Sequence, residues 1–308
     1  MIESGMSKYS RYTNPYDISF DDDTLPATRL SPNDTVGAYT YMFVREPYGR
    51  LLSFYVDKLM ASNPYYWKVV GVNAAKLRSR SNTFVGFGHD VTFQEFIKYA
   101  IQTMVSGKNV DPHWVEMERN CRGCEIKYDY IGKMETFAQN ADEILLKLGL
   151  NTTREFLKQD GGLEGDFDAI KDSVIQPYVY EIKYKHCLSF QKAVERAWEK
   201  LQIRGLIASG PAPSNLTSKT SSWKDLFDLA KTSRFSASKS ERKQLKRDLQ
   251  KKYWAQINVE DLYKIKRLYA KDFKLFVYDD HPEIVFQGRT LLTKWFLLFM
   301  IHILFSYS

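Results

Sequence analysis

The sequence contains few cysteines and no long apolar run near its beginning. Three cysteines in 308 residues are too few for a disulfide-based scaffold. Residues 1–39 hold no apolar run, so no signal peptide or anchor is visible there. The very apolar segment 295–305 is shorter than the ~20 residues that a membrane span needs, and we predict a buried or interfacial segment. A hydrophobic content of 44% with 26% charged residues excludes a disordered chain.

The charge balance favours an anionic partner. The net charge is +7 and the sequence pI is about 9.0, which suits a nucleotide, a nucleic acid or an acidic polysaccharide. No recognised nucleic-acid-binding module is present, so nucleic acid is not the expected partner. Sequons at Asn33, Asn151 and Asn215 weakly support a luminal compartment.

Residues 40–59 predict a strand, a tight turn and a helix. The apolar run from Tyr41 to Val44 is long enough for one buried strand. Pro47 stands where the first helical turn would begin, and an apolar helical face follows it, formed by Tyr48, Leu51, Leu52, Tyr55 and Leu59. The predicted fold is therefore α/β, with Arg45 at the carboxyl end of a strand, where ligands bind in open α/β sheets.

The polar side of this helix suggests an anion site. Glu46, Arg50, Ser53 and Asp57 share that side by their spacing. An Arg fork with a hydroxyl suits a phosphate monoester, and helix N-termini attract phosphate. A surface ion pair followed by an ordinary amphipathic helix remains the alternative.

The rest of the chain divides by composition into irregular, helical and loop segments. We expect irregular structure over 1–38 and a loop over 63–82, whose basic residues Lys76, Arg78 and Arg80 could face an anion. A capping box, Thr92 with Glu95, predicts a helix from 93 to 104, and 126–131 predicts a strand. The remaining expected segments are helices at 135–148, 189–205, 223–231, 239–253 and 259–271, a loop at 160–168, and a Pro/Ser/Thr-rich linker at 208–222.

Several motifs in order resemble the Golgi carbohydrate sulfotransferases, the group that contains chondroitin 4-O-sulfotransferase. The run FVREPYGRLLSFYVDKL resembles the family's 3′-phosphate-binding segment. VTFQEF at 91–96, His113-Trp114, Cys121-x-x-Cys124, YDYIGKME at 128–135 and the helix 261–278 follow in the family's order. The resemblance implies a sulfotransferase-type, P-loop-like α/β domain over 39–280, with a parallel sheet flanked by helices and a helix-rich C-terminal part. Residues 160–252 match poorly and suggest an insertion, and 281–308 form an apolar tail.

This resemblance implies a function and a donor. The donor is 3′-phosphoadenosine 5′-phosphosulfate (PAPS), no metal is expected, and the acceptor is a hydroxyl of a carbohydrate, a glycosaminoglycan or another Golgi glycan. Arg45 and Ser53 correspond to the family's 3′-phosphate ligands, and Arg50 is a weaker addition from the same helix side. Relatives are held in the Golgi membrane by an N-terminal anchor, so the implied location is the Golgi lumen or membrane.

One part of the family pattern is not found in this sequence. The relatives hold the donor's 5′-phosphosulfate with a Pro-Lys-x-x-x-Thr-x-Trp loop before the 3′-phosphate segment, and no such loop precedes Arg45. We therefore expect that the sequence lacks the family's N-terminal part and transfers sulfate poorly. The alternative functions are an inactive sulfotransferase-like module that binds nucleotide or acidic glycan and, from another class, a basic nucleic-acid-binding protein.

Two further motifs remain open to more than one interpretation. His113 could act near neutral pH and Trp114 could stack on a sugar, which makes them candidates for the acceptor region; a capped turn histidine beside a core tryptophan is the alternative. Cys121 and Cys124 could join His113 and Cys187 around zinc, but a second paired ligand set is missing. The resemblance favours a Cys121–Cys124 disulfide.

The segment 239–252 is strongly basic, with seven basic residues and two acidic ones. Lys239, Arg242, Lys243, Lys246, Arg247 and Lys251 crowd one helical side. A solvated helix face and a binding strip for acidic polysaccharide are the two interpretations.

Overall fold

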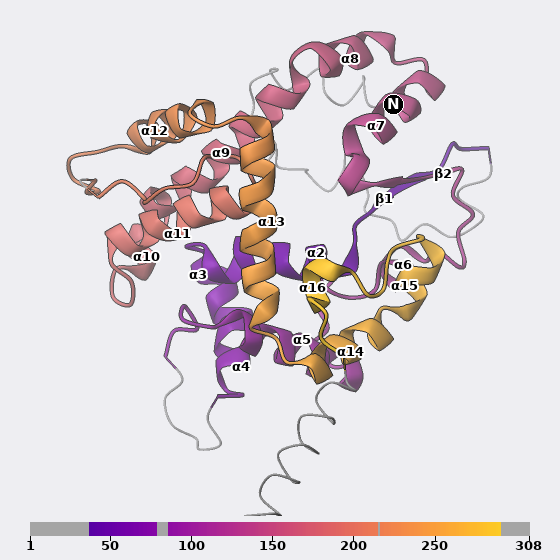
Figure 1. The fold of residues 1–308 in the computed structure, drawn as a ribbon, viewed down its shortest axis with the longest axis horizontal. Coiled ribbons are helices and arrows are strands. Elements are labelled where there is room, and N and C mark those ends of the chain that lie inside the picture. The colour runs from indigo at the N-terminus through magenta and orange to yellow at the C-terminus, as the bar shows by residue number, and fades with distance from the viewer. Residues whose placement is uncertain (1–36, 79–85, 215, 291–308) are drawn as a thin grey trace, which may run out of the picture.

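Two short parallel strands and a larger set of helices make up the fold, which we describe from a computed structural model. The structure describes residues 37–78, 86–214 and 216–290. Strand β1 (Tyr41–Val44) pairs with β2 (Tyr130–Lys133), Tyr41 opposite Tyr130 and Val44 opposite Lys133. Both strands therefore end at the same edge, and each leads into a helix (Figure 1). The predicted parallel α/β arrangement is confirmed.

The predicted strand–turn–helix is present. Helix α2 (Pro47–Phe54) follows β1, with Pro47 in its first turn, and continues as the π-helix η3 (Tyr55–Met60). Strand β2 begins later than the predicted strand, because Ile126 is still in a turn bonded to the Arg122 carbonyl. Gly132 of β2 lies against the ring of Phe43, where a Cβ would come within 2.6 Å of Cε1, so this position needs glycine.

The main core surrounds helix α2. The Tyr48 ring packs against Trp254, Phe273 and Phe286 at centroid distances of 5.3–6.0 Å. These partners come from α13 (Lys239–Ala255), α15 (Ala270–Leu275) and α16 (Glu283–Phe286), while α5 (Phe93–Ser106) and α14 (Val259–Leu268) complete the core. Residues 283–286, expected in an apolar tail, thus belong to this core.

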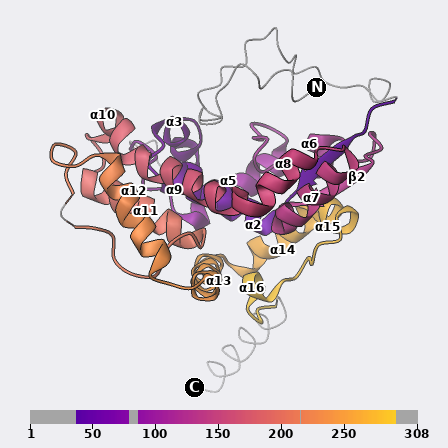
Figure 2. The ribbon, with the colours of Figure 1, turned by 90° about the horizontal axis from the view of Figure 1, so that it is seen from above.

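Helices between residues 162 and 235 form a second core. It lies among α9 (Gly162–Val179), α11 (Phe190–Ile203) and α12 (Trp223–Phe235) and includes the buried residues Ile170, Val174, Trp198 and Leu226. Figures 1 and 2 show α9 to α12 on one side of α13, with both strands on the other. The segment suspected as an insertion therefore contains most of a separate packing unit.

Two predicted loops are helical, so those predictions were wrong. Residues 64–75 form α3 (Pro64–Tyr66), η4 (Trp67–Gly71) and α4 (Val72–Ala75), and η6 (Leu157–Gly161) and α9 replace the loop at 160–168. The side chain of Asn63 caps α3, accepting from the Tyr66 N–H at 3.3 Å, and Gly71 packs directly on Gly88. The remaining helices are short: α6 (Met117–Cys121), η5 (Met134–Thr136), α7 (Phe137–Lys147), α8 (Asn151–Phe156) and α10 (Glu181–Tyr184).

The other helical predictions are confirmed to within a few residues, and the described residues of 208–222 form no helix or strand. The predictions for residues 1–36, Arg80 and 291–308 lie outside the described residues. None of the described helices is long and apolar enough to cross a bilayer.

Candidate functional site

The turn between β1 and α2 is built around the carboxyl group of Glu46. This residue caps α2, and its two oxygens accept from the backbone N–H groups of Tyr48 and Gly49, at 3.0 and 2.5 Å. A side chain at position 49 would crowd this carboxyl group, because a Cβ there lies 3.2 Å from Glu46 Oε2. Burial raises the pKa of Glu46 to about 7. The N-terminal amides of α2 therefore already have a partner, and an anion here must be held by side chains.

Arg45 leaves the end of β1 at this turn. Its side chain is half-buried, and no ion pair or hydrogen bond of its guanidinium is formed within the described ranges. Burial lowers the pKa of Arg45, while Glu135 and Glu46 act in the opposite direction. An arginine placed between solvent and core, at a strand end, is well placed for a charge-assisted contact with an oxyanion.

The end of β2 supports the same turn. Glu135 accepts from the backbone N–H of Glu46 at 3.0 Å and from the Tyr278 hydroxyl at 2.9 Å. Lys133 donates to the carbonyl of Val277 at 3.0 Å, and its ammonium lies 4.4 Å from the centre of the Tyr278 ring. Glu135 is therefore a positioning group for the turn.

Ser53 lies half-buried on α2, on the same helical side as Asp57. Within the described residues its hydroxyl makes no hydrogen bond. Asp57 is bound to the fully buried Lys200 of α11, with Nζ 2.5 Å from Oδ1. Burial would raise the pKa of Asp57, but Lys200 outweighs this and holds it well below its usual range. The polar side of α2 is thus covered by α11 near Asp57.

Arg50 takes a different course from Arg45. Its guanidinium donates to the carbonyl oxygens of Pro112 and Val115, and burial lowers the pKa of Arg50. The side chain therefore ties α2 to the 111–115 segment. With two of its nitrogens on these carbonyls, Arg50 does not lie beside Ser53 as a free cation, in contrast to the sequence-based expectation.

The two alternatives for His113 and Trp114 are resolved by burial. Trp114 is 1% exposed and donates from Nε1 to the Thr103 hydroxyl at 3.1 Å. No ring face remains for a sugar, so the stacking role is corrected to a core role. His113 is exposed, and both its backbone N–H and Nδ1 contact Asp111 Oδ1, at 2.8 and 2.6 Å. It is a capped turn histidine beside a core tryptophan.

The expected Cys121–Cys124 disulfide is not formed, because all three cysteines are free. Cys121 packs toward the small cluster of Met42, Val44 and Phe276. Cys124 is exposed, and the nearby Glu118 carboxyl group raises the pKa of its thiol. The two sulfur atoms therefore lie in different environments, one apolar and one exposed. No group of three or more metal-binding side chains occurs among the described residues.

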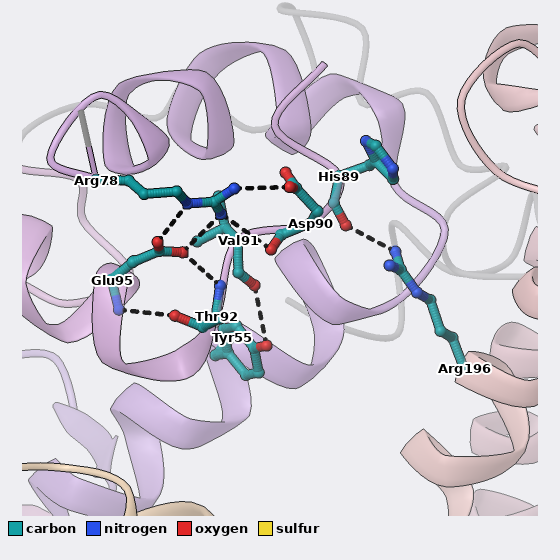
Figure 3. A network of polar contacts seen from close by, with 8 residues as sticks. All are labelled: Tyr55, Arg78, His89, Asp90, Val91, Thr92, Glu95 and Arg196. Atoms are coloured by element: carbon teal, nitrogen blue, oxygen red, sulfur yellow. Dashed lines mark hydrogen bonds and ion pairs between the residues drawn. The ribbon is translucent and has the colours of Figure 1, made fainter. Parts of the chain in front are cut away.

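The basic residues after α4 are used internally. Figure 3 shows Arg78 between Asp90 and Glu95, with its guanidinium nitrogens 2.8 Å from Asp90 Oδ2 and 2.6 Å from Glu95 Oε1. The same glutamate completes the Thr92 capping box of α5. Lys76 donates to Asn73. The expectation that Arg78 faces an anion is corrected: its side chain links the segment after α4 to Asp90 and to the N-terminus of α5.

The basic helix at 239–252 is α13, and its cations divide into two kinds. Lys239, Lys243, Arg247 and Lys251 are exposed, whereas Arg242 donates to the carbonyls of Arg234 and Ala237. Lys246 is half-buried, and burial together with the charge of Arg45 lowers its pKa. In addition to burial, Arg204, at the end of α11, lowers the pKa of Arg45. Sequence reasoning did not connect these two cations to Arg45; the basic composition of α13 was the only signal.

Parts of this chain are similar in sequence to known proteins. A model of the sulfotransferase family matches residues 14–171. Carbohydrate sulfotransferase 8 of Mus musculus is 37% identical over 114 residues, which cover 36% of this chain and 27% of that protein. Carbohydrate sulfotransferase 9 of Homo sapiens is 34% identical over 131 residues, with coverages of 39% and 29%. Carbohydrate sulfotransferase 11 of Rattus norvegicus is 28% identical over 169 residues, with coverages of 51% and 47%.

These aligned regions cover from about a quarter to about half of the relatives' lengths. No solved structure gives a significant match. The family match includes β1, α2, α5, β2 and α7, and thus both strand ends at which Arg45 and Glu135 lie. Because this match spans half of the chain, the protein belongs to the sulfotransferase family.

Proposed function

We propose that this protein binds PAPS and transfers its sulfuryl group to a hydroxyl of a carbohydrate. The observation that carries the proposal is Arg45, at the carboxyl end of β1 with its guanidinium uncommitted within the described residues. Several relatives are named carbohydrate sulfotransferases, which supports the carbohydrate acceptor. The Golgi lumen is the proposed location, as the resemblance of the sequence motifs to the Golgi carbohydrate sulfotransferases implies.

In this proposal Arg45 and Ser53 hold the donor's 3′-phosphate. Both side chains are half-buried, so a phosphate between them would be partly shielded from water, where charge-assisted contacts strengthen. Arg50 is left out, because its guanidinium is bound to the carbonyls of Pro112 and Val115. Glu46 and Glu135 hold the turn and keep Arg45 in place.

The reaction moves one sulfuryl group. The acceptor hydroxyl oxygen forms a bond to sulfur, the bond between sulfur and the bridging oxygen of the 5′-phosphate breaks, and the hydroxyl proton passes to a base. The products are the sulfated sugar and adenosine 3′,5′-bisphosphate. Positioning and charge stabilisation supply most of the acceleration in group transfers of this kind, so holding the 3′-phosphate fixes the donor before the chemical step.

Calorimetry with adenosine 3′,5′-bisphosphate tests the donor site. Arg45→Ala removes a charged contact of about 1.5–3 kcal/mol, so we expect binding to weaken by roughly 10- to 100-fold. Arg119→Ala, an exposed arginine on α6, is the matched control. Equal affinity of wild type and Arg45→Ala would refute the assignment.

Activity is measured by transfer of labelled sulfate from PAPS to desulfated chondroitin and related glycans. Turnover that falls in Arg45→Ala supports the enzyme. Binding of bisphosphate without turnover on any glycan would instead favour the inactive nucleotide-binding module. Competition between glycan and RNA for the protein separates both from a nucleic-acid-binding protein.

A further inference from the structure

Helix α11 is held against η3, the continuation of α2, by a buried ion pair. Lys200 is 0% exposed, and its ammonium contacts Asp57 at 2.5 Å and Asp172 at 3.5 Å. One turn earlier, Arg196 donates to the His89 carbonyl at 2.8 Å (Figure 3). A buried charge is strongly tied to its partner. These contacts therefore determine which residues of α11 face the polar side of α2.

The next turn of α11 brings Arg204 toward the end of β1. Arg204 follows Lys200 by four residues and so shares its helical side. On the partner helix, Ser53 precedes Asp57 by the same number of residues. Lys200 lies on Asp57, and the charge of the exposed Arg204 acts on Arg45, so Arg204 lies on the side of Lys200 that is nearer to the end of β1.

Helix α13 adds a third cation to this region. It touches the end of α11 at Gly205, where a Cβ would lie 3.2 Å from the Arg242 carbonyl oxygen and 3.3 Å from Lys246 Cβ. Figures 1 and 2 show the end of α11 beside α13. Burial lowers the pKa of Lys246, and the charges of Arg45 and Arg204 lower it further.

The charges of the three cations are only partly compensated within the protein. Within the described residues, no ion pair or hydrogen bond is formed by the side chains of Arg45, Arg204 and Lys246. Glu135 and Glu46 act on Arg45, and Glu135 also acts on Lys246, so two carboxyl groups stand against three cations. Gathered like charges destabilise a folded protein, and such local costs are typical of binding sites.

We propose that Arg204 and Lys246 complete the phosphate site of Arg45 and Ser53, so that α11 and α13 grip a phosphate monoester together with α2. This inference rests on the proposed function. Both helices lie beyond residues 14–171, the segment matched to the family model. The occupant is the doubly charged 3′-phosphate of the nucleotide, since a dianion is better matched to three cations than a singly charged sulfate ester.

The first test compares two nucleotides by calorimetry. Wild type, Arg204→Gln and Lys246→Met are titrated with adenosine 3′,5′-bisphosphate and with AMP, which lacks the 3′-phosphate. Each variant is expected to bind the bisphosphate about 5- to 50-fold more weakly and AMP almost unchanged. Lys251→Met removes an exposed cation from the same helix and should stay within about twofold of wild type.

The second test measures Tm with and without the bisphosphate, because a merely structural role of Lys246 would change these two values differently. Lys246→Met relieves like-charge repulsion, so its Tm without nucleotide should equal or exceed that of wild type, while the rise in Tm caused by the bisphosphate should shrink. A lower Tm together with an unchanged rise would contradict the proposal. A different outcome would assign the cations to a glycan. In it, chondroitin sulfate oligosaccharide displaces the bisphosphate from wild type but no longer does so from either variant.

The outcomes separate this inference from the proposed function. No bisphosphate binding by wild type overturns the proposed function itself. Binding that falls in Arg45→Ala but not in Arg204→Gln or Lys246→Met leaves the function intact and overturns the role of α11 and α13. An equal loss for AMP and the bisphosphate would also overturn it, because the 3′-phosphate would then not be the group recognised.

Discussion

Replacing Glu46 by glutamine should change how stability depends on pH. The half-buried carboxyl group lies at the N-terminus of α2, and burial raises its pKa from 4.5 to about 7. The folded protein thus binds a proton that the unfolded chain has already lost. Stability from this group is fully present below pH 4.5 and is lost as the pH rises through 7.

The two pKa values give the size of the effect. A difference of one pKa unit is worth about 1.4 kcal/mol. With values of 4.5 and about 7, ionisation of Glu46 lowers the free energy of unfolding by roughly 2.5 kcal/mol between pH 5 and pH 8. Glutamine cannot ionise and keeps one oxygen for the amides of Tyr48 and Gly49. The variant's stability should therefore vary less over this range.

Urea unfolding at pH 5, 6, 7 and 8 measures the difference between wild type and Glu46→Gln. We expect the free energy of unfolding of the variant to rise relative to that of wild type as the pH rises. This holds even if the loss of one cap hydrogen bond makes the variant less stable at pH 5. Glu155→Gln, at an exposed position on α8, controls for the loss of a carboxylate. A wild-type-minus-variant difference that stays constant from pH 5 to pH 8 would refute the reasoning.

Two further predictions concern packing. Lys200→Met leaves Asp57 and Asp172 without their buried partner and should lower the free energy of unfolding in urea by about 3–5 kcal/mol. Adding Asp57→Asn should recover part of this loss. Strictly additive effects of the two substitutions on the free energy of unfolding would contradict the pairing. Gly71→Ala places a Cβ 2.3 Å from the Gly88 carbonyl oxygen and should cost about 1–3 kcal/mol, whereas Gly162→Ala, with open space, should be neutral or stabilising; equal Tm values would count against the close approach.

The elements with strong local signals were predictable from sequence. Strand β1, helix α2 and helix α5 have apolar periods together with Pro47 or the Thr92–Glu95 box, and all three were confirmed. The helices over 64–75 were missed because they are short and depend on a distant contact of Gly71 with Gly88. The glycines at 161–165 suggested a loop, but packing of α9 on α11 and α12 overrides their low helix propensity.

The candidate site was predictable only where one segment carries it. The strand–turn–helix pattern placed Arg45 at a strand end and Ser53 on the polar side of the helix, and the resemblance to the family assigned both to the 3′-phosphate. Arg204 and Lys246 could not be placed, because periodicity tells which side of a helix is polar but not which distant element faces it. The same limit explains Trp114, whose exposure depends on Thr103 and the rest of the core, and Arg50, whose partners lie 62 and 65 residues away.

The packing around Tyr48 has a consequence for the order in which the chain can fold. Its ring contacts come from α13, α15 and α16, and its hydroxyl bonds to the Asp280 carbonyl, 232 residues away. On the ribosome, the family-matched segment 14–171 would emerge with the apolar face of α2 uncovered. The residues that cover this face are synthesised only later, at 254–286. Distant contacts of this kind slow folding and leave apolar surface open to aggregation. Expression of residues 14–171 alone should therefore yield an aggregating product, and chaperone dependence should end only when residue 286 has emerged.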